Sequence, residues 1–288
     1  MSAPIPSAAA SGSFLIGGDL PVNRLGYGTM RLVGDGAWGE PADPAEAHRV
    51  LRRAVELGVT LIDTADAYGP EIAERLIAEA LYPYPAGLVI ATKGGITRQG
   101  PAKTEYVGRA GYLIQCVEMS LRRLKLERID LYQLHRIDSR FPLEDQLGAL
   151  AELQRAGKIR HIGLSEVTVP EIVAARELVE VVSVQNLYNL TNRQSEAVLD
   201  YCTAEGIGFI PWFPLASGKL VEPGGAVAEV AAAVGASAGQ VALAWLLHRS
   251  PVMLPIPGTS SVAHVEENCA AATVTLSDAQ VATLDAAA

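Results

Sequence analysis

The segment Val59-Thr60-Leu61-Ile62-Asp63-Thr64-Ala65-Asp66-Ala67-Tyr68-Gly69 contains an apolar run, a carboxylate at its end and a tyrosine five positions later. The run predicts a buried strand, because it is short, rich in β-branched residues and preceded by Gly58, which ends a helical pattern. Asp63 therefore stands where a strand ends, and a carboxylate is costly there unless another group compensates it. Taken alone, Asp63 could equally cap the next helix, and Tyr68 could be a loop aromatic.

The same alternation of strand and helix patterns continues on both sides of this segment. Apolar runs predict strands at 24–30, 59–62, 88–92, 129–134, 159–164, 181–184, 207–210 and 252–256. Helical spacing follows them at 43–57, 71–81, 112–124, 143–155, 170–178, 193–204, 238–248 and 262–271, with a short final helix from 277. Eight such units predict an α/β fold, a (β/α)8 TIM barrel, preceded by a short N-terminal β-hairpin at 14–22.

No Gly-rich dinucleotide fingerprint of the open-sheet kind follows the first strand, which also favours a barrel over a doubly wound sheet. Since no linker divides the chain, residues 13–288 are predicted to form a single barrel domain. Residues 1–12 are rich in Ala, Ser and Pro, and they have neither a cationic start nor an apolar segment. We expect them to be a flexible tail rather than a signal peptide or a membrane span.

The composition narrows the range of partners. Of the 288 residues 49% are hydrophobic, which allows a large core, and the net charge of −9 disfavours nucleic acid as a partner. The three cysteines, Cys116, Cys202 and Cys269, have no paired spacing, so we expect no disulfide, no zinc site and a reducing, cytoplasmic compartment. The expected protein is a monomer or weak oligomer that acts on a small molecule, without a membrane or nucleic-acid partner.

Polar or aromatic residues stand at the ends of several predicted strands, where a barrel gathers its chemistry on one face. Each has an ordinary explanation when it is taken alone: a lysine is usually solvated, a histidine often bonds a carbonyl, and a tryptophan is often part of a core. Six such residues at one rim of the barrel are much better explained by a functional site than by coincidence. The residues concerned are Asp63, Lys93, His135, Ser165, Gln185 and Trp212.

The types of these residues indicate acid catalysis beside a carbonyl group. A tyrosine has a pKa of roughly 10, and a nearby ammonium favours its phenolate and lowers that pKa. The ammonium needs a carboxylate if it is to stay charged in a closed pocket. Tyr68, Lys93 and Asp63 supply these three parts, and His135 could donate a hydrogen bond to a carbonyl oxygen. Since no metal cluster or thiol supplies a hydride, a nicotinamide is implied.

The sequence resembles the aldo-keto reductase family over nearly its whole length after the N-terminal tail. The matching motifs include 26–30 (GYGTM), 63–69 (DTADAYG), 91–95 (ATKGG), 131–135 (LYQLH), 162–165 (IGLS), 211–215 (PWFPL) and 256–261 (IPGTSS). Within the family the chain is most similar to bacterial members of the pyridoxal reductase kind, through 22–28, 68–70, 80–84 and 258–264. Framework residues can be shared by enzymes with different substrates, so the substrate is left open.

The resemblance implies a catalytic tetrad of Asp63, Tyr68, Lys93 and His135, and it implies NADPH extended across the barrel mouth. It places Ser165 and Gln185 at the carboxamide, and Trp212 under the nicotinamide. Glu166 stands where the family usually has asparagine. The other residues implied to contact NADPH/NADP are Gly28, Thr29, Met30, Asp63, Pro214, Leu215, Ser217, Gly218, Leu220, Gly258, Thr259, Ser260, Ser261, His264, Glu267 and Asn268.

A second departure concerns the 2′-phosphate of the cofactor. Many relatives carry a lysine or arginine in the loop after the last strand, whereas 258–261 has none, and His264 is the one potential cation nearby. Hydroxyl groups, backbone N–H groups and the start of the last helix can still bind phosphate. We therefore expect a preference for NADPH over NADH, of modest size.

Two other functions remain open from the residues. The chain could be a cofactor-binding regulatory subunit on the same fold, because fold does not fix function. It could also be a metal-dependent hydrolase with His135, Asp138 and Asp63 as ligands, although no second histidine stands at ligand spacing. Carbonyl reduction is the expected activity. The loops around the mouth are short or undistinguished, and we expect no long C-terminal loop over the pocket, so an open mouth should favour broad use of aldehydes.

Overall fold

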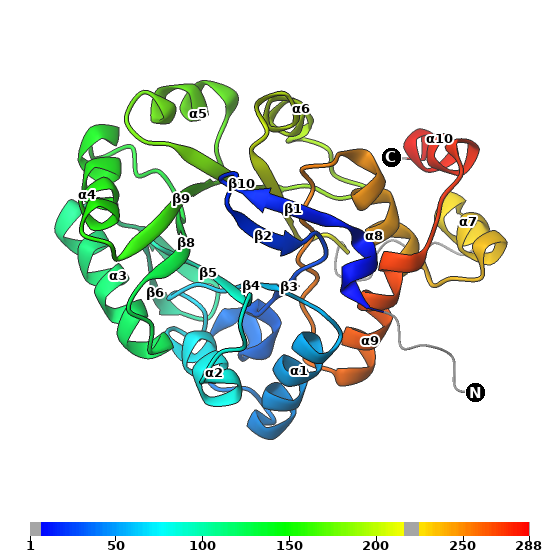
Figure 1. Cartoon of the computed structure of the whole chain (residues 1–288), viewed down its shortest axis with the longest axis horizontal. Coiled ribbons are helices and arrows are strands. Elements are labelled where there is room, and N and C mark those ends of the chain that lie inside the picture. Colours follow the sequence, from blue (N-terminus) through cyan, green and yellow to red (C-terminus); the bar gives the residue numbers. More distant parts are fainter. Residues whose placement is uncertain (1–6, 216–224, 288) are drawn as a thin grey trace.

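The computed structural model describes residues 7–215 and 225–287, in which a curled parallel sheet is covered on its outside by helices (Figure 1). The sheet has seven strands in the order β11-β10-β9-β8-β5-β4-β3. All its neighbouring pairs are parallel. The bounds are β3 Tyr27–Gly28, β4 Leu61–Asp63, β5 Val89–Gly94, β8 Ile129–Leu134, β9 Ile159–Ser165, β10 Val181–Leu187 and β11 Gly208–Trp212.

The helices begin where the sequence offers capping groups. Asp43 accepts from the Glu46 N–H at the start of α1, with Pro44 in the first turn, and Thr168 and Glu171 form a capping box at α5. The helices are α1 Pro44–Glu56, α2 Ile72–Leu81, α3 Ala110–Leu124, α4 Leu143–Arg155, α5 Val169–Arg176, α6 Glu196–Glu205, α7 Ala226–Val234, α8 Ala238–Arg249, α9 Val262–Ala270 and α10 Asp278–Ala286.

The predicted strand at 252–256 is not a regular strand. Pro255 interrupts it, Pro251 and Pro257 flank it, and a proline cannot donate to a ladder. The segment nevertheless lies between the two edges of the sheet. Backbone bonds join it to Phe209 of β11, from the Leu254 N–H at 2.8 Å, and the Gly26 N–H donates to its Pro255 carbonyl at 2.9 Å.

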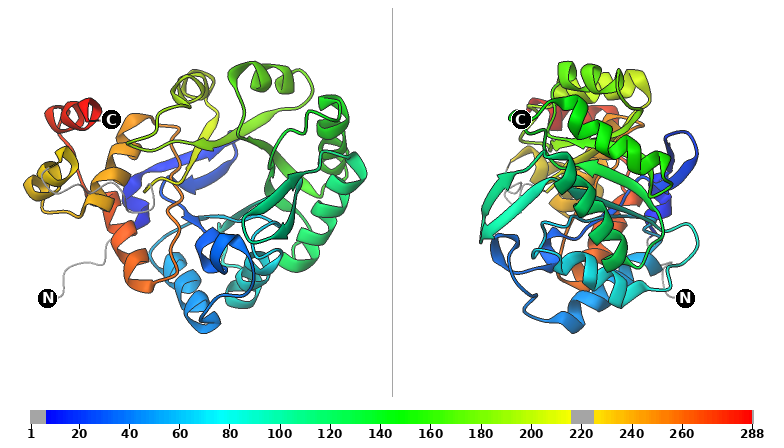
Figure 2. Two further views of the ribbon diagram at one scale, coloured as in Figure 1. Left: turned by 180° about the vertical axis from the view of Figure 1, so that it is seen from behind. Right: turned by 90° about the vertical axis from the view of Figure 1, so that its left-hand side faces the viewer.

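One end of the curled sheet is closed by the chain's own beginning. Strands β1 (Ser13–Ile16) and β2 (Leu20–Asn23) pair antiparallel around a turn at 17–19. Figure 2 shows this hairpin at the end of the molecule opposite to a second hairpin, formed by β6 (Ile96–Gly100) and β7 (Lys103–Tyr106). Apolar side chains of the first hairpin fill the interior of the sheet, in one cluster with Leu61, Val89, Ala91, Leu131, Val182, Ile210 and Leu254.

The prediction of a flexible tail is wrong from residue 7 onward. Ala8–Ser11 form a 3-10 helix, and the side chain of Ala8 is fully buried. The Ala8 N–H donates to the Leu57 carbonyl at 2.7 Å, and Ser11 Oγ accepts from the Leu25 N–H. Ala8 and Ser11 are the buried residues of this segment, whereas Ala9 and Ala10 are exposed. Residues 1–6 lie outside the described part of the chain.

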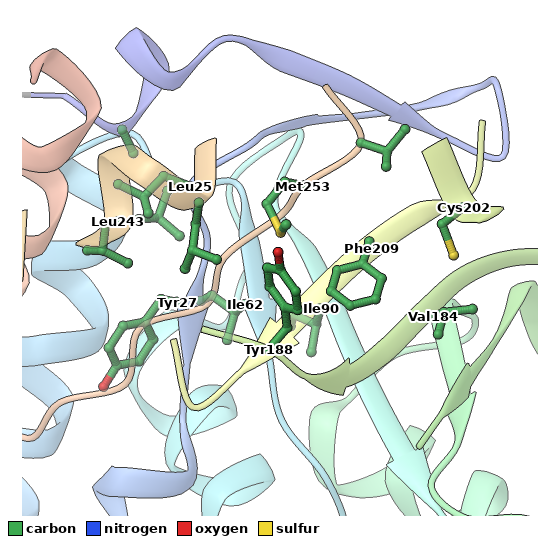
Figure 3. Packing of buried hydrophobic residues seen from close by; sticks show 14 of the residues in the cluster. Leu25, Tyr27, Ile62, Ile90, Val184, Tyr188, Cys202, Phe209, Leu243 and Met253 are labelled. Carbon is green, nitrogen blue, oxygen red and sulfur yellow. The ribbon is translucent and has the colours of Figure 1, made fainter. Parts of the chain in front are cut away.

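The main core lies between the sheet and its helices. Tyr188 stacks on Trp245 of α8, with ring centroids 5.9 Å apart, and meets Phe209 edge-on at 5.8 Å. Figure 3 shows Tyr188 and Phe209 packed beside Met253. Burying a large apolar side chain stabilises a fold by roughly 1.5–3 kcal/mol, so this cluster holds α8 and the 252–256 segment against the sheet.

The length and composition of a helix decide whether it could cross a membrane. No single helix in the described ranges is both long and apolar enough to cross a bilayer. Only α7 and α8 taken together, across a bend of 93°, satisfy length and composition. The middle of α8, from Val241 to Leu246, is buried in the core described above.

Candidate active site

The predicted rim residues meet at the end of the sheet that the N-terminal hairpin leaves open. Asp63 ends β4, Lys93 is the next-to-last residue of β5, and His135 follows β8 directly. A cavity of about 300 Å³ opens at this end. The predicted residues that line it are Gly28, Met30, Asp63, Tyr68, His135, Ser165, Gln185, Trp212, Pro214, Leu215 and Gly258.

Lys93 lies behind the cavity wall and is fully buried. Its ammonium donates to Asp63 Oδ1 at 2.7 Å, to the Thr64 carbonyl at 2.8 Å and to the Tyr68 hydroxyl at 3.4 Å. The three polar contacts use the three donors of an ammonium, so the buried charge is fully compensated. The third contact joins the charged ammonium of Lys93 to the hydroxyl of Tyr68, the tyrosine of the predicted tetrad.

Burial and neighbouring charges shift the pKa values of Lys93, Tyr68 and His135. Burial lowers the pKa of Lys93, but Asp63 and Tyr68 more than offset this, and the net shift is upward. Burial raises the pKa of Tyr68, and the charge of Lys93 reduces this rise without reversing it. Burial, helped by Lys93, lowers the pKa of His135 far below its usual range. At neutral pH the site therefore holds a charged lysine, a protonated tyrosine and a neutral histidine.

Lys93 acts to lower the pKa of Tyr68, as predicted, but the net shift of this pKa is upward. The tyrosine pKa stays above its ordinary value because the phenolate would be buried beside the Asp63 carboxylate as well as beside the ammonium. A protonated phenol is the form that can donate a proton. The rings of Tyr68 and His135 meet edge-on, with centroids 6.1 Å apart, so both polar groups serve the same part of the cavity.

Two glutamines hold the second oxygen of Asp63. Gln185 Nε2 donates to Asp63 Oδ2 at 2.8 Å, and Gln133 Nε2 does so at 3.3 Å. The amide nitrogen of Gln185 is therefore already bonded, which leaves its carbonyl oxygen for any ligand in the cavity. Gln133 was not predicted as a site residue, although its place two residues before His135 on β8 could have indicated that it points toward the same interior.

Glu166 takes a different place from the one predicted. It does not line the cavity, and its Oε1 accepts from the Leu187 N–H and from Trp212 Nε1, each at 2.6 Å. Its backbone has a φ of 55°, in the left-handed region that asparagine adopts more readily. The two hydrogen bonds offset that strain. Glu166 therefore orients the indole of Trp212, and any contribution to ligand binding is made through that ring.

The remaining predicted residues gather near the start of α9. Tyr27 donates its hydroxyl proton to the Thr259 carbonyl at 2.5 Å, and the Ser261 N–H donates to Thr259 Oγ1 at 3.1 Å. The carboxylate of Glu46 accepts from the Val262 N–H, the first of the helix, at 3.1 Å. An acid thus stands where a phosphate was expected to bind. Ser217, Gly218 and Leu220 lie outside the described residues.

A buried carboxyl group behind the site should make stability depend on pH. Asp66 is 8% exposed, and burial, with a smaller effect of Glu74, raises its pKa to about 7. An unfolded aspartate has a pKa of about 3.9, so the stability that this group contributes is present below pH 4 and is lost as the pH rises through 7. Asp66→Asn, which stays neutral, should unfold at higher urea concentration than the parent at pH 8.

The gain at pH 8 should approach about 4 kcal/mol, since each unit of pKa difference is worth about 1.4 kcal/mol, and it should shrink toward pH 4, where both folded side chains are neutral. Urea titrations of the two proteins at pH 4.5, 6 and 8 measure this difference. A difference in unfolding free energy that stayed constant over these three pH values would show that Asp66 titrates like an exposed carboxyl group.

The other reactive side chains do not form a competing centre. Among the described residues no three His, Cys, Asp or Glu side chains are close enough to share a metal ion. Asp138, the metal ligand considered above, is bound to Arg140 at 2.9 Å and to the Gly108 N–H at 2.9 Å. Cys116, Cys202 and Cys269 are buried, free thiols whose pKa values are raised by burial.

Comparison with known proteins places the chain in a family. The profile of the Aldo/keto reductase family matches residues 24–288. The chain is 44% identical over 282 residues to pyridoxine 4-dehydrogenase of Escherichia coli, covering 96% of this chain and 98% of that one. It is 54% identical over 268 residues to an uncharacterized oxidoreductase of Schizosaccharomyces pombe, covering 93% and 87%.

The fold agrees with this relationship. An aldo-keto reductase from Klebsiella pneumoniae, solved in complex with NADPH, superimposes with a TM-score of 0.81 at 26% identity, covering 95% of this chain and 94% of that chain. The chain belongs to the aldo/keto reductase family of oxidoreductases, whose members use NADP(H). The predicted family and enzyme class are confirmed, and the roles of individual residues stay predictions.

Proposed function

We propose that the chain reduces the carbonyl group of an aldehyde or ketone to an alcohol with NADPH, and that Tyr68 is the general acid. The series of contacts from Asp63 through Lys93 to the Tyr68 hydroxyl, beside a neutral His135, supports this most directly. It supplies a protonated phenol with a fixed positive charge behind it. These are the groups needed to protonate a carbonyl oxygen as it gains electrons.

Each residue of the tetrad has a separate task in this proposal. NADPH, when bound, supplies the hydride. Tyr68 gives its proton to the carbonyl oxygen, and Lys93 stabilises the phenolate that remains. Asp63 keeps Lys93 charged. His135 lines the cavity, so that it can donate a hydrogen bond to the same oxygen and orient the carbonyl.

The side chains of the cavity fit a nicotinamide. Ser165 Oγ accepts from Arg136 at 3.0 Å, so its own proton remains free to bond a carboxamide oxygen. Gln185 has its carbonyl oxygen available for the carboxamide N–H, as described above. Trp212, held by Glu166, offers an aromatic face. We propose that these residues hold the nicotinamide, with Gly28, Met30, Pro214, Leu215 and Gly258 along the cavity wall and Thr259, Ser260, Ser261 and His264 at the adenosine end.

The position of Glu46 leads to a prediction about cofactor preference. Its carboxylate at the start of α9 would face the 2′-phosphate that distinguishes NADPH from NADH, and like charges repel. Glu46→Gln keeps an oxygen for the Val262 N–H and removes the charge. We expect the ratio of the NADH to the NADPH dissociation constant to rise about 3- to 10-fold, equivalent to about 0.7–1.4 kcal/mol.

Fluorescence titration of the parent and the variant with both cofactors measures this ratio. Glu56→Gln, at the exposed end of α1, is a matched control that should leave it unchanged, because Glu56 bonds Arg53 and none of the predicted cofactor residues. Equal ratios in the parent and in Glu46→Gln would mean that the phosphate binds elsewhere.

A turnover assay tests the function itself. Oxidation of NADPH should be followed at 340 nm with aromatic aldehydes, pyridoxal, small ketones and sugar aldehydes, all with the same purified protein. The E. coli relative is a pyridoxine dehydrogenase, so pyridoxal is proposed as a substrate to be tested first. Tight NADPH binding without turnover of any carbonyl compound would instead favour the regulatory-subunit function.

Three structural proposals accompany this function. We propose that 252–256 acts as the eighth strand and completes a (β/α)8 barrel, because its backbone bonds Phe209 and Gly26 on the two edges of the sheet. We propose that 13–288 is one catalytic domain. The buried free thiols suit a reducing compartment such as the cytoplasm, and the proposed partner is a small carbonyl compound.

A further inference from the structure

Besides Arg31, two arginines that the tetrad does not use line the same cavity. Arg98 comes from β6 of the second hairpin, and Arg136 follows His135 directly. Both side chains are half-buried. Sequence patterns did not single them out: Arg98 lies in a polar segment that was predicted to be a loop, and Arg136 is one residue past a strand end.

Neither guanidinium has a carboxylate partner. Arg98 donates to the Ala67 carbonyl at 3.0 Å and to the Gly36 carbonyl at 3.3 Å. Arg136 donates to the His135 carbonyl at 2.6 Å and to Ser165 Oγ at 3.0 Å. Among the residues that the structure describes, no carboxylate oxygen lies within 4 Å of either side chain. The partners are neutral carbonyl and hydroxyl groups, so they do not balance the positive charges of Arg98 and Arg136.

Arg24 also donates to backbone carbonyls, but other arginines of the chain are paired with acids. Arg123 on α3, also largely buried, is bound to the carboxylates of Glu71 and Glu74 at 3.0 Å and 2.6 Å. The chain as a whole has a net charge of −9, so acidic partners are plentiful elsewhere. Asp63 is the one acid that lines the described part of the cavity, and it is bound to Lys93. The cavity therefore carries an excess of positive charge inside an acidic protein.

The two charges lie close enough to act on the reacting groups. After burial and Lys93, the positive charges of Arg136 and Arg98 contribute to lowering the pKa of His135. Arg136 also acts to lower the pKa of Tyr68, against the larger effect of burial. A substrate with its carbonyl oxygen at Tyr68 and His135 would thus place the rest of its body between or beside the two guanidiniums.

Aromatic surface accompanies the charge. The guanidinium of Arg136 lies 6.0 Å from the ring centroid of Tyr106, which is 44% exposed at the end of β7. Phe213, 38% exposed, also lines the cavity, beside Trp212. Flat rings and guanidinium groups together suit a planar substrate with a negative group at its edge.

We propose that this site selects carbonyl compounds that carry an anionic group, a carboxylate or a phosphate, bound by Arg98 and Arg136 while the carbonyl oxygen lies at Tyr68 and His135. This inference rests on the proposed reductase function and adds the substrate class to it. An anion replaces the missing counter-charge of both arginines, and charge-assisted hydrogen bonds to guanidinium are about twice as strong as neutral ones.

Three aldehydes of similar shape test the proposal: 4-carboxybenzaldehyde, 4-formylphenyl phosphate and the neutral 4-methylbenzaldehyde. With the parent protein, kcat/KM for the better anionic aldehyde should exceed that for the neutral one at least about 10-fold, mainly through KM. Which anion is better distinguishes a carboxylate site from a phosphate site. The preference should weaken as salt is raised from 50 to 500 mM, because ions screen exposed charges.

Arg98→Gln and Arg136→Gln should each reduce the ratio of anionic to neutral kcat/KM about 10-fold, and the ratio cancels losses that both substrates share. Arg52→Gln is the matched control: Arg52 also donates to a backbone carbonyl, that of Ala80, but it lies on the outer surface of α1. Its ratio should equal that of the parent. The dissociation constant of NADPH, measured for all variants, shows that each one is folded.

Three results would overturn the proposal. Equal kcat/KM for all three aldehydes in the parent would remove the anion preference while leaving the reductase function intact. Arginine variants that weaken NADPH binding 10-fold and leave the substrate ratio unchanged would assign the two residues to the cofactor. No turnover of any aldehyde would overturn both this inference and the proposed function.

Discussion

Replacing Tyr68 by phenylalanine should lower kcat by about 10² to 10⁴ while NADPH still binds. The hydroxyl that receives the Lys93 contact at 3.4 Å is removed, whereas the ring that meets His135 edge-on is kept. Without the phenol, no group in the described cavity wall is placed to deliver a proton beside His135. The imidazole of His135 cannot replace the phenol. The lowered pKa of His135 keeps its ring neutral, and the N–H of a neutral imidazole is only a weak acid.

Steady-state rates with a neutral aldehyde and NADPH titrations of the same preparation provide the measurement. Tyr82→Phe is the matched control, because Tyr82 is 52% exposed at the end of α2, away from the cavity. The control should keep the parent rate. If Tyr68→Phe also turned over at close to the parent rate, Tyr68 would not be the proton donor, and another acid would have to be sought.

Lys93→Met should abolish most of the turnover and also destabilise the fold. The activity falls because the phenolate left by Tyr68 would lose its ammonium. The stability falls because Asp63, 1% exposed, would remain as a buried charge with only Gln185 and Gln133 as donors. Breaking a buried pair by removing one partner typically costs about 3–5 kcal/mol. Urea unfolding and steady-state rates of one preparation measure both effects.

The double variant Asp63→Asn with Lys93→Met separates the two effects. It removes both charges, so a large part of the stability lost in Lys93→Met should return, while turnover should stay low. Recovery of activity together with stability would show that Lys93 acts only by supporting the fold. A Lys93→Met protein as stable as the parent would mean that Asp63 takes up a proton or finds another partner.

Local patterns in the sequence were enough to locate the tetrad on the fold. Asp63, Lys93 and His135 follow apolar runs whose lengths and flanking glycines predict strands, and parallel strands place their ends on one face. The matches to the family motifs assigned these residues to one site, and the family and enzyme class are confirmed. These features could be predicted because each depends on residues that are neighbours in the chain.

Features that depend on distant segments appeared only in the structure. The order at Ala8 depends on its burial and on its bond to the Leu57 carbonyl, about 50 positions away, and the irregular 252–256 segment is held by bonds to Phe209 and Gly26. The β6–β7 hairpin lacks the apolar alternation of a strand, since the four residues of β7 are all exposed. Hydrophobic periodicity reflects which residues are buried, so it does not predict a hairpin whose side chains are exposed.

The positions of the charged groups in the site also appeared only in the structure. The sequence placed Glu166 at the nicotinamide, but the fold turns its carboxylate toward Trp212 and Leu187. Glu46 reaches the start of α9 from a helix more than 200 positions earlier, at a separation of 216 residues. Strand ends were determined by the sequence itself, because hydrophobic periodicity is local. The charges that face the ligand were decided by the tertiary structure, because they come together only when distant segments pack.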